Sequence, residues 1–294
     1  MELKVKVDKD SGHIHLPVHV NGQGPFDFAL DTGAGMTTIS KSLADKLGIK
    51  TYEAEKRKAA GVGGNLVDVM AAKADQLRIG AEEFQNREVA VIDFDSIFGC
   101  GRFAPGVIGH DILKDYVLSV NYHAREIAFD KAPRANLGRD NGIEWIDFRY
   151  AGDTHLVVVP VHINGEGPFE LVLDTGSSGT VITPTLAKEL GLAQSSPPCL
   201  EDQAAEEGRG CSEGVCPGVG GVAVGYGTTL KQLSVGRTAV ENVMAAVIDL
   251  RVVSPKGEKI DYGILGYPFL KNYRLVIDYP RKRFALMSEQ KRSK

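Results

Sequence analysis

Two halves of this chain repeat each other, and the repeat limits the possible folds more than any other feature of the sequence. HVNGQGPF at residues 19–26 recurs as HINGEGPF at 162–169, a spacing of 162 − 19 = 143 residues. The same spacing relates two Asp-Thr-Gly triplets, which begin at Asp31 and Asp174 and each end an apolar run. A repeat of this length indicates two copies of one folding unit within a single chain.

The repeat continues downstream with a changed spacing. GVIGHDILKDY at 106–116 recurs as GILGYPFLKNY at 263–273, now 157 residues apart. The second copy has therefore gained 157 − 143 = 14 residues, and the gain falls in a polar segment, 194–216, that carries three of the four cysteines. We expect an N-terminal unit of residues 1–135 and a C-terminal unit of residues 136–294, each within the usual size of a domain.

Each copy contains patterns typical of strands joined by tight turns. β-branched runs such as VVVPVHI at 157–163 favour strands, and the Asn-Gly steps at Asn21 and Asn164 favour two-residue hairpin turns. Short helices are expected after Ser40 and Thr183, because each can cap a helix that ends at a glycine. The sequence therefore predicts a mainly β, mostly antiparallel fold with few short helices.

Composition narrows the class of protein. The chain has 294 residues, 43% hydrophobic and 24% charged, which is typical of a soluble globular protein. The net charge of −4 and the lack of a long basic run argue against a nucleic-acid binder. The sequence contains no run of 18 apolar residues, so no membrane span is expected. The first residues carry no signal-peptide core, but a leader could have been removed, so the compartment stays open.

Cysteine and histidine positions do not predict a metal site. No C-x2-C pair of the kind that zinc sites favour is present. The cysteines of the inserted segment could be free thiols or could form one disulfide in an oxidising compartment. His13 and His15 lie on one strand face, where a metal pair is conceivable, but no matching carboxylate cluster accompanies them. We expect these imidazoles to be surface or partly buried groups.

The two repeated aspartates suggest a shared chemical role. A carboxylate at the end of an apolar strand is costly to bury unless something stabilises it. If the halves pack about a pseudo-twofold axis, Asp31 and Asp174 can meet on that axis and share one proton. Such a pair can hold a water, deprotonate it as it attacks a carbonyl, and protonate the carbonyl oxygen. A duplicated structural turn is the alternative interpretation.

The two triplets, with Val107-Ile108-Gly109 and Ile264-Leu265-Gly266 downstream, resemble the retropepsin-like aspartic protease family. The resemblance covers nearly all of both halves, as if two retropepsin-sized units had been fused into one pepsin-like chain. It implies two homologous β-barrel lobes related by a pseudo-twofold axis, with a complete active site formed by one chain.

The resemblance also implies a role for particular residues. Asp31 and Asp174 would be the catalytic dyad, and Thr32 and Thr175 would hydrogen-bond across the two loops. The remaining assignments concern backbone support and closure over the substrate. They comprise Gly33, Ala34, Gly176 and Ser177 as loop support, Gly109 and Gly266 packed behind the dyad, and two glycine-rich flap tips, Gly61, Val62, Gly63 and Gly64 and Gly218, Val219, Gly220 and Gly221.

The two loops differ at the residue after the triplet. A serine at this position, here Ser177, can donate to its aspartate in the family and favour ionisation, whereas Ala34 cannot. We therefore expect an asymmetric pair, with Asp174 the more readily ionised member and Asp31 the more often protonated one.

The sequence thus predicts an aspartic endopeptidase that acts as a monomer on an extended peptide or protein substrate between its lobes. No cofactor and no metal are expected. Two alternatives stay open. One is a peptide-binding module on the same fold without turnover, and the other is a protease whose site forms between two chains.

Overall fold

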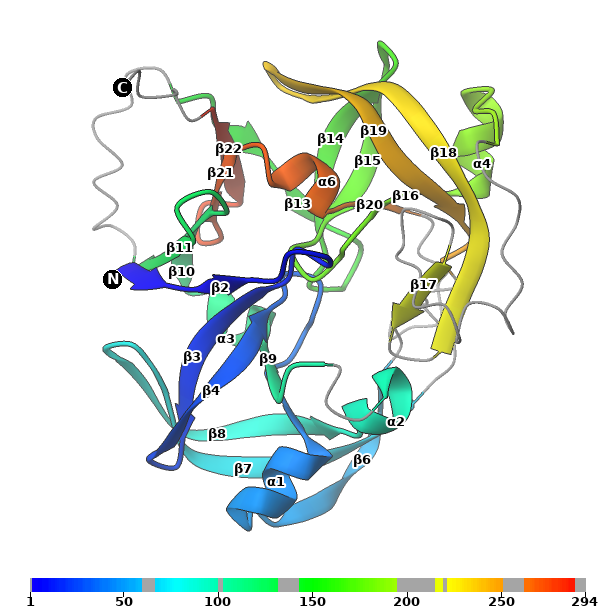
Figure 1. Ribbon diagram of the computed structural model, residues 1–294. Helices are drawn as coiled ribbons and strands as arrows, with labels where there is room; N and C mark the ends of the chain where they lie inside the picture. The colour runs from blue at the N-terminus through cyan, green and yellow to red at the C-terminus, as the bar shows by residue number, and fades with distance from the viewer. Residues whose placement is uncertain are drawn as a thin grey trace.

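A computed structural model describes residues 2–59, 67–99, 103–131, 143–194, 215–218, 221–250 and 262–288. Strands make up most of this part of the chain, and the helices are short (Figure 1). Three sheets account for the strands, one for each half of the chain and one that the halves share. The predicted fold class, two similar β lobes with few helices, is confirmed.

The N-terminal half forms an eight-stranded sheet. Most neighbours are antiparallel, but β4 pairs in parallel with β9, and β5 pairs in parallel with β8. The sheet order is β2 (Lys6–Val7), β3 (Ile14–Val20), β4 (Gln23–Leu30), β9 (Gly106–Ile108), β5 (Thr38–Ser40), β8 (Glu82–Ile92), β7 (Val67–Ile79) and β6 (Thr51–Ala59).

The C-terminal half repeats this sheet strand for strand. Its parallel pairs occur at the equivalent places, between β15 and β20 and between β16 and β19. The order is β13 (Arg149–Tyr150), β14 (Val157–Ile163), β15 (Glu166–Leu173), β20 (Gly263–Leu265), β16 (Thr180–Ile182), β19 (Thr238–Ile248), β18 (Gly221–Val235) and β17 (Val215–Gly218).

A third sheet of six strands joins the halves. Its centre is the antiparallel pair β10–β21, in which Ser119 of the first half lies opposite Val276 of the second. Because backbone hydrogen bonds cross between the halves here, the two lobes share a common base. The order is β1 (Glu2–Lys4), β11 (Glu126–Lys131), β10 (Tyr116–Asn121), β21 (Arg274–Asp278), β22 (Arg283–Met287) and β12 (Ile146–Asp147).

The Asn-Gly steps form the tight turns that the sequence predicts. Asn21 and Gly22 have φ values of 50° and 76°, and Asn164 and Gly165 have 55° and 88°. Positive φ at both central residues is the type I′ geometry, which suits the twist of the flanking strands. The turns therefore set the register of β3 against β4 and of β14 against β15.

The short helices begin and end where their caps predict. The Ser40 hydroxyl accepts the N–H of Leu43 at 3.0 Å to start α1 (Lys41–Leu47), and Gly48 ends it at φ 64°. Thr183 caps α4 (Pro184–Glu189) in the same way. Three further helices occur in the described residues, namely α2 (Phe94–Phe98), α3 (His110–Leu113) and α6 (Tyr267–Leu270).

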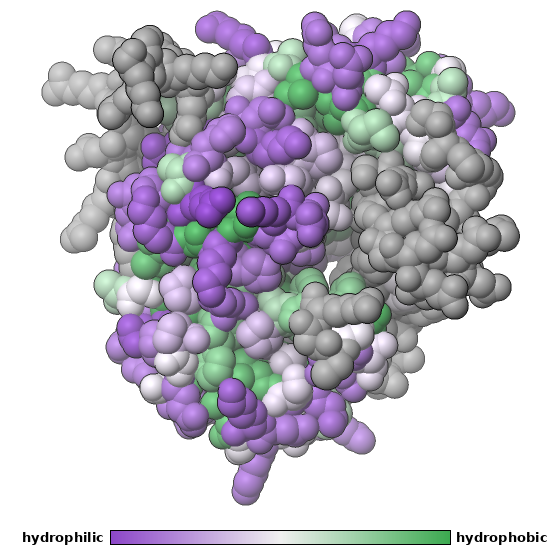
Figure 2. All heavy atoms as spheres, viewed as in Figure 1, coloured by the Kyte–Doolittle hydropathy of each residue, from purple (hydrophilic) through white to green (hydrophobic). Residues whose placement is uncertain are grey.

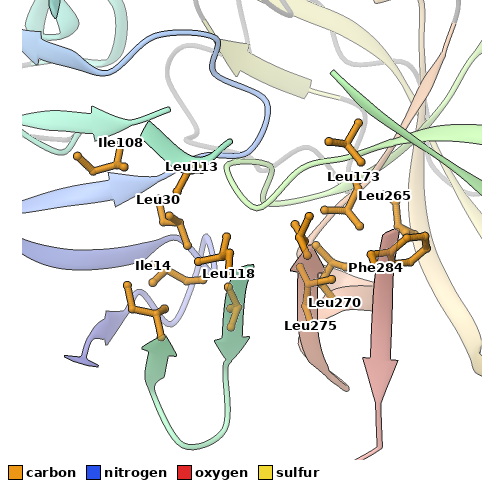
Figure 3. Close-up of a cluster of buried hydrophobic side chains, with 14 of the residues drawn as sticks. Ile14, Leu30, Ile108, Leu113, Leu118, Leu173, Leu265, Leu270, Leu275 and Phe284 are labelled. Carbon is orange, nitrogen blue, oxygen red and sulfur yellow. The ribbon is translucent and has the colours of Figure 1, made fainter. Parts of the chain in front are cut away.

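The buried core repeats with the sequence. Leu30 and Leu173, which precede the two aspartates, are 1% and 0% exposed, and both belong to one hydrophobic cluster that spans the lobes. Figure 3 shows the equivalent side chains in two groups, one from each half. The further equivalent pairs in that view are Ile108 and Leu265, Leu113 and Leu270, and Leu118 and Leu275.

The face of the molecule in Figure 2 carries mainly hydrophilic side chains, with smaller hydrophobic areas between them. Among the described residues, no helix is long and apolar enough to cross a membrane. The expected boundary between residues 135 and 136 lies outside the part of the chain that the structure describes.

Candidate active site

Asp31 and Asp174 lie at the ends of two equivalent strands, in the region between the lobes. Asp31 follows β4, and its N–H donates to the carbonyl of Ile108 at 3.2 Å. Asp174 follows β15, and its N–H donates to the carbonyl of Leu265 at 3.1 Å. Each aspartate is therefore anchored by the parallel strand beside it, at the same point of the repeat.

Thr32 and Thr175 link the two loops through reciprocal hydrogen bonds. The Thr32 hydroxyl accepts the N–H of Thr175 at 3.0 Å and donates to the carbonyl of Leu173 at 2.9 Å. The Thr175 hydroxyl accepts the N–H of Thr32 at 3.2 Å and donates to the carbonyl of Leu30 at 3.0 Å. Because both threonines are buried, these four bonds fix one loop against the other.

The glycine after each threonine faces the carboxyl group of the opposite loop. A Cβ atom placed on Gly33 would lie 2.9 Å from Cγ of Asp174, and one on Gly176 would lie 2.5 Å from Cγ of Asp31. The two carboxyl groups therefore lie together between the loops, and only glycine leaves room for them.

The two carboxyl groups have unequal surroundings. Asp31 Oδ1 accepts the N–H groups of Gly33 at 2.8 Å and Ala34 at 2.9 Å. Asp174 Oδ1 accepts the N–H of Gly176 at 2.8 Å, and the N–H of Gly33, which is shared with Asp31, also approaches Asp174 and acts to lower its pKa. Burial, followed by the nearby charge of Asp31, raises the pKa of Asp174 well above its ordinary value.

This asymmetry is opposite to the one that the sequence led us to expect. The Ser177 hydroxyl donates to the carbonyl of Gly179 at 2.9 Å and so does not favour ionisation of Asp174. The expectation that Asp174 is the more readily ionised member therefore lacks the hydrogen bond on which it depended, and the raised pKa of Asp174 argues against it.

Gly109 and Gly266 lie directly behind the two loops. A Cβ on Gly109 would be 2.7 Å from the backbone of Met36, and one on Gly266 would be 2.0 Å from the carbonyl of Gly179. The residue after each glycine donates to the adjacent loop, for example the N–H of His110 to the carbonyl of Ala34 at 2.8 Å. These contacts leave no space for a side chain at either position.

Most of the expected flap residues lie outside the described part of the chain. This applies to Gly61, Val62, Gly63 and Gly64 in the first half and to Val219 and Gly220 in the second. Gly218 and Gly221 are described, and they pair across the β17–β18 hairpin. Strand β17 of the C-terminal half lies against α2 of the N-terminal half (Figure 1). Residues 195–214 of the inserted segment are likewise outside the description.

Two histidines that the sequence did not single out for this site reach the loop glycines. His13 Nε2 lies 2.9 Å from the carbonyl of Gly176, and His155 Nε2 lies 2.7 Å from that of Gly33. Burial lowers the pKa of His13. Comparison of the halves does not reveal the two histidines as a pair, because the 143-residue spacing aligns His13 with Leu156.

Two buried tyrosines also accompany the site. Tyr122 and Tyr279 are 7% and 2% exposed, and burial is the main cause that raises the pKa of each phenol. The charges of Asp31 and Asp174 raise the pKa of Tyr279 further. Among the described residues, no group of three histidine, cysteine or acidic side chains is placed to hold a metal ion.

Comparison with known proteins identifies relatives of both halves. A family model described as aspartyl protease matches residues 16–112 and 159–269. No curated protein matches the sequence. Among solved structures, a retropepsin-like aspartic protease from Rickettsia conorii is 21% identical, covers 44% of this chain and 89% of its own, and has a TM-score of 0.31. Basic 7S globulin from soybean is 12% identical, covers 98% of this chain and 95% of its own, and has a TM-score of 0.50. This second likeness is one of fold.

Proposed function

The chain belongs to the aspartyl protease family, and from that premise we propose that it is an aspartic endopeptidase whose catalytic pair is Asp31 and Asp174. The observation that carries the proposal is the exchange between the loops, in which each loop glycine faces the other loop's carboxyl group. Two carboxyl groups in such proximity cannot both ionise readily, so they share a proton.

The unequal surroundings suggest a role for each member of the pair. Asp31 receives two backbone N–H bonds and is the proposed base, whereas the raised pKa of Asp174 makes it the proposed acid. Asp31 takes a proton from a water whose oxygen attacks the peptide carbonyl carbon. Asp174 gives its proton to the carbonyl oxygen, which leaves a neutral tetrahedral diol.

Collapse of the diol completes the balance of protons. Asp31 passes the proton it took to the amide nitrogen, and the C–N bond breaks. Asp174 recovers a proton from one diol hydroxyl as the new carboxylic acid forms. The cycle restores one shared proton on the pair and requires no cofactor.

One chain supplies both aspartates, which supports action as a monomer. We propose that residues 1–135 and 136–294 are the two units of the site and that an extended peptide binds between them. Backbone hydrogen bonds would position such a peptide, and side-chain pockets would select it.

Digestion of a peptide library at pH 3–8, with and without a transition-state-mimicking inhibitor, tests the proposal. The wild-type chain is expected to cleave, and Asp31→Asn and Asp174→Asn are each expected to lose activity. Asp45→Asn, an exposed change on α1, is the matched control and is expected to cleave normally.

Two other outcomes separate the alternatives. Peptide binding without cleavage by the wild-type chain would favour a binding module on this fold. Recovery of activity when the two single mutants are mixed, together with a dimeric mass, would favour a site formed between chains. Inactive single mutants that stay inactive when mixed support the intrachain pair.

A further inference from the structure

Two histidines cross between the lobes to reach the loops that carry the aspartates. His13 belongs to the N-terminal half and contacts the carbonyl of Gly176, whereas His155 belongs to the C-terminal half and contacts that of Gly33. A carbonyl oxygen can only accept, so Nε2 must carry the proton in each imidazole. Each lobe therefore donates one N–H to the loop of the other.

The two contacts do not follow from simple duplication. At the repeat spacing of 143 residues, His13 aligns with Leu156 and His155 aligns with Gly12. The backbone hydrogen bonds support this alignment. The N–H of Asp8 donates to the carbonyl of His13, and at the equivalent place the N–H of Ala151 donates to the carbonyl of Leu156. The halves thus make the same contact from neighbouring positions of the repeat, which indicates a requirement for the contact itself.

The contacted carbonyls belong to the peptide units that lie beside the carboxyl groups. In a trans peptide the C=O and N–H groups point in opposite directions. The carbonyl of Gly33 points to His155, and the N–H of the same unit, from Ala34, donates to Asp31 Oδ1 at 2.9 Å. A donor at one end of a peptide unit also strengthens the hydrogen bond at the other end.

We propose that His155 and His13 are positioning residues, each of which holds the peptide unit after the loop glycine of the opposite lobe, and that His155 thereby directs the Ala34 N–H onto Asp31. The proposal rests on the proposed function, because it assigns Asp31 the role of base. Neither imidazole is placed in contact with the reacting atoms.

The surroundings of His155 are built to hold its ring. A Cβ on Gly35 would lie 2.8 Å from Cε1 and Nδ1 of His155, so the glycine provides the space for the imidazole. The ring of His110 lies 5.9 Å away between centroids, and its Nε2 is 3.0 Å from the Tyr150 hydroxyl. Tyr279 in turn packs edge-on against His110 at 5.6 Å.

The surroundings of His13 differ in character. Its ring packs against Phe103 at 6.0 Å and against His15 at 6.5 Å. Asp8, whose carboxylate accepts the N–H and hydroxyl of Ser11, closes the turn that presents His13. The same loop contact is thus supported by different neighbours in the two halves.

Two substitutions at one position test the role of His155. His155→Phe keeps a planar ring without a donor, whereas His155→Gln keeps a side-chain N–H. We expect His155→Phe to lower kcat about ten- to a hundredfold, as for a lost hydrogen bond coupled to a charged group, with little change in KM. The acidic limb of the pH profile, which reports ionisation of the carboxyl pair, should move to higher pH. His155→Gln should restore both quantities to near wild type.

Histidines on the strands that follow His13 and His155 serve as matched controls. His162→Phe on β14 and His19→Phe on β3 are expected to leave kcat and the acidic limb unchanged. His13→Phe is expected to lower kcat in the same direction as His155→Phe. The proposal is overturned if folded His155→Phe keeps the wild-type acidic limb, or if His155→Gln is no better than His155→Phe.

A second readout separates this proposal from the proposed function. If the wild-type chain cleaves nothing, the proposed endopeptidase is refuted, and the free energy of unfolding is measured between pH 3 and 8 instead. His155→Phe should then change the pH dependence of unfolding, and His155→Gln should restore it. Identical curves for wild type and His155→Phe would overturn the positioning role by itself.

Discussion

Thr32 and Thr175, 143 residues apart in the chain, each accept the backbone N–H of the other and donate to the carbonyl that precedes the other's aspartate. Each hydroxyl therefore uses both its donor and its acceptor capacity within the opposite lobe. Since the two residues are 0% and 2% exposed, water cannot replace a lost partner. The position of one carboxyl group relative to the other depends on this exchange.

Replacement of either hydroxyl by a methyl group is expected to be costly. Thr32→Val leaves the N–H of Thr175 and the carbonyl of Leu173 without this partner in a buried place. We expect a loss of about 2–4 kcal/mol in the free energy of unfolding, because two buried polar groups lose a hydrogen bond. Chemical denaturation measures this loss.

Thr180 provides a control of the same chemistry. Its hydroxyl is fully buried and has no hydrogen-bond partner in the part of the chain that the structure describes. Thr180→Val should therefore leave stability unchanged or raise it slightly. Equal losses for Thr180→Val and Thr32→Val would show that the crossed hydrogen bonds contribute little.

Substitution of a loop glycine is expected to lower activity more than stability. Gly176→Ala would place a methyl group 2.5 Å from Cγ of Asp31, so the carboxyl group must move. A displacement of about 1 Å in a reacting group can cost about a hundredfold in rate, and we expect at least that loss in peptide cleavage. Gly48→Ala, at φ 64° with open space around it, should cost stability but leave the rate unchanged.

Much of the fold could be predicted because both copies of the repeat carry local signals for turns and helix starts. Asn21-Gly22 and Asn164-Gly165 fix hairpin turns, and Ser40 and Thr183 fix helix starts. The parallel pairs β4–β9 and β15–β20 are long-range, and periodicity along one strand does not show which distant strand lies beside it.

The candidate site was predictable only where both halves carry the same residue. Asp31 and Asp174 stand out as a repeat, whereas His13 and His155 occupy different positions of it. Their contacts depend on how the lobes pack, which no local pattern encodes. Ser177 was misjudged for the same reason, because the partner of a hydroxyl depends on the backbone around it, here the carbonyl of Gly179.

A third prediction follows from that contact. Because the Ser177 hydroxyl donates to Gly179 and not to Asp174, Ser177→Ala should leave the pH profile of cleavage unchanged. Loss of one buried hydrogen bond should lower the free energy of unfolding by about 1 kcal/mol. A shift of the acidic limb in this variant would instead assign the serine a direct effect on the carboxyl pair.

The raised pKa of Asp174 predicts how stability varies with pH. The folded state holds the Asp174 proton more tightly than the unfolded chain, whose ordinary value is 3.8. Stability is therefore lost as the pH rises above about 4 and through the folded-state pKa. Asp174→Asn cannot ionise, so its advantage over wild type should be absent at pH 3 and grow toward neutrality, by about 1.4 kcal/mol for each pKa unit.

Denaturation of both proteins across this pH range measures the difference. Asp45→Asn, which alters an exposed pair with Lys41, should differ from wild type by less than about 0.5 kcal/mol at every pH. A constant difference between Asp174→Asn and wild type would mean that burial does not perturb this carboxyl group.

The buried tyrosines give the last prediction. Within the described residues, the hydroxyls of Tyr279 and Tyr122 have no hydrogen-bond partner, whereas the Tyr273 hydroxyl donates to the carbonyl of Ala239 at 2.8 Å. Removal of an unpaired buried hydroxyl relieves a desolvation cost, so Tyr279→Phe should leave stability unchanged or raise it by up to about 1 kcal/mol. Tyr273→Phe leaves the carbonyl of Ala239 without this donor and should lower the free energy of unfolding by about 1–2 kcal/mol. Thermal and chemical unfolding measure both variants, and an equal loss of stability in Tyr279→Phe and Tyr273→Phe would mean that the Tyr279 hydroxyl does have a hydrogen-bond partner.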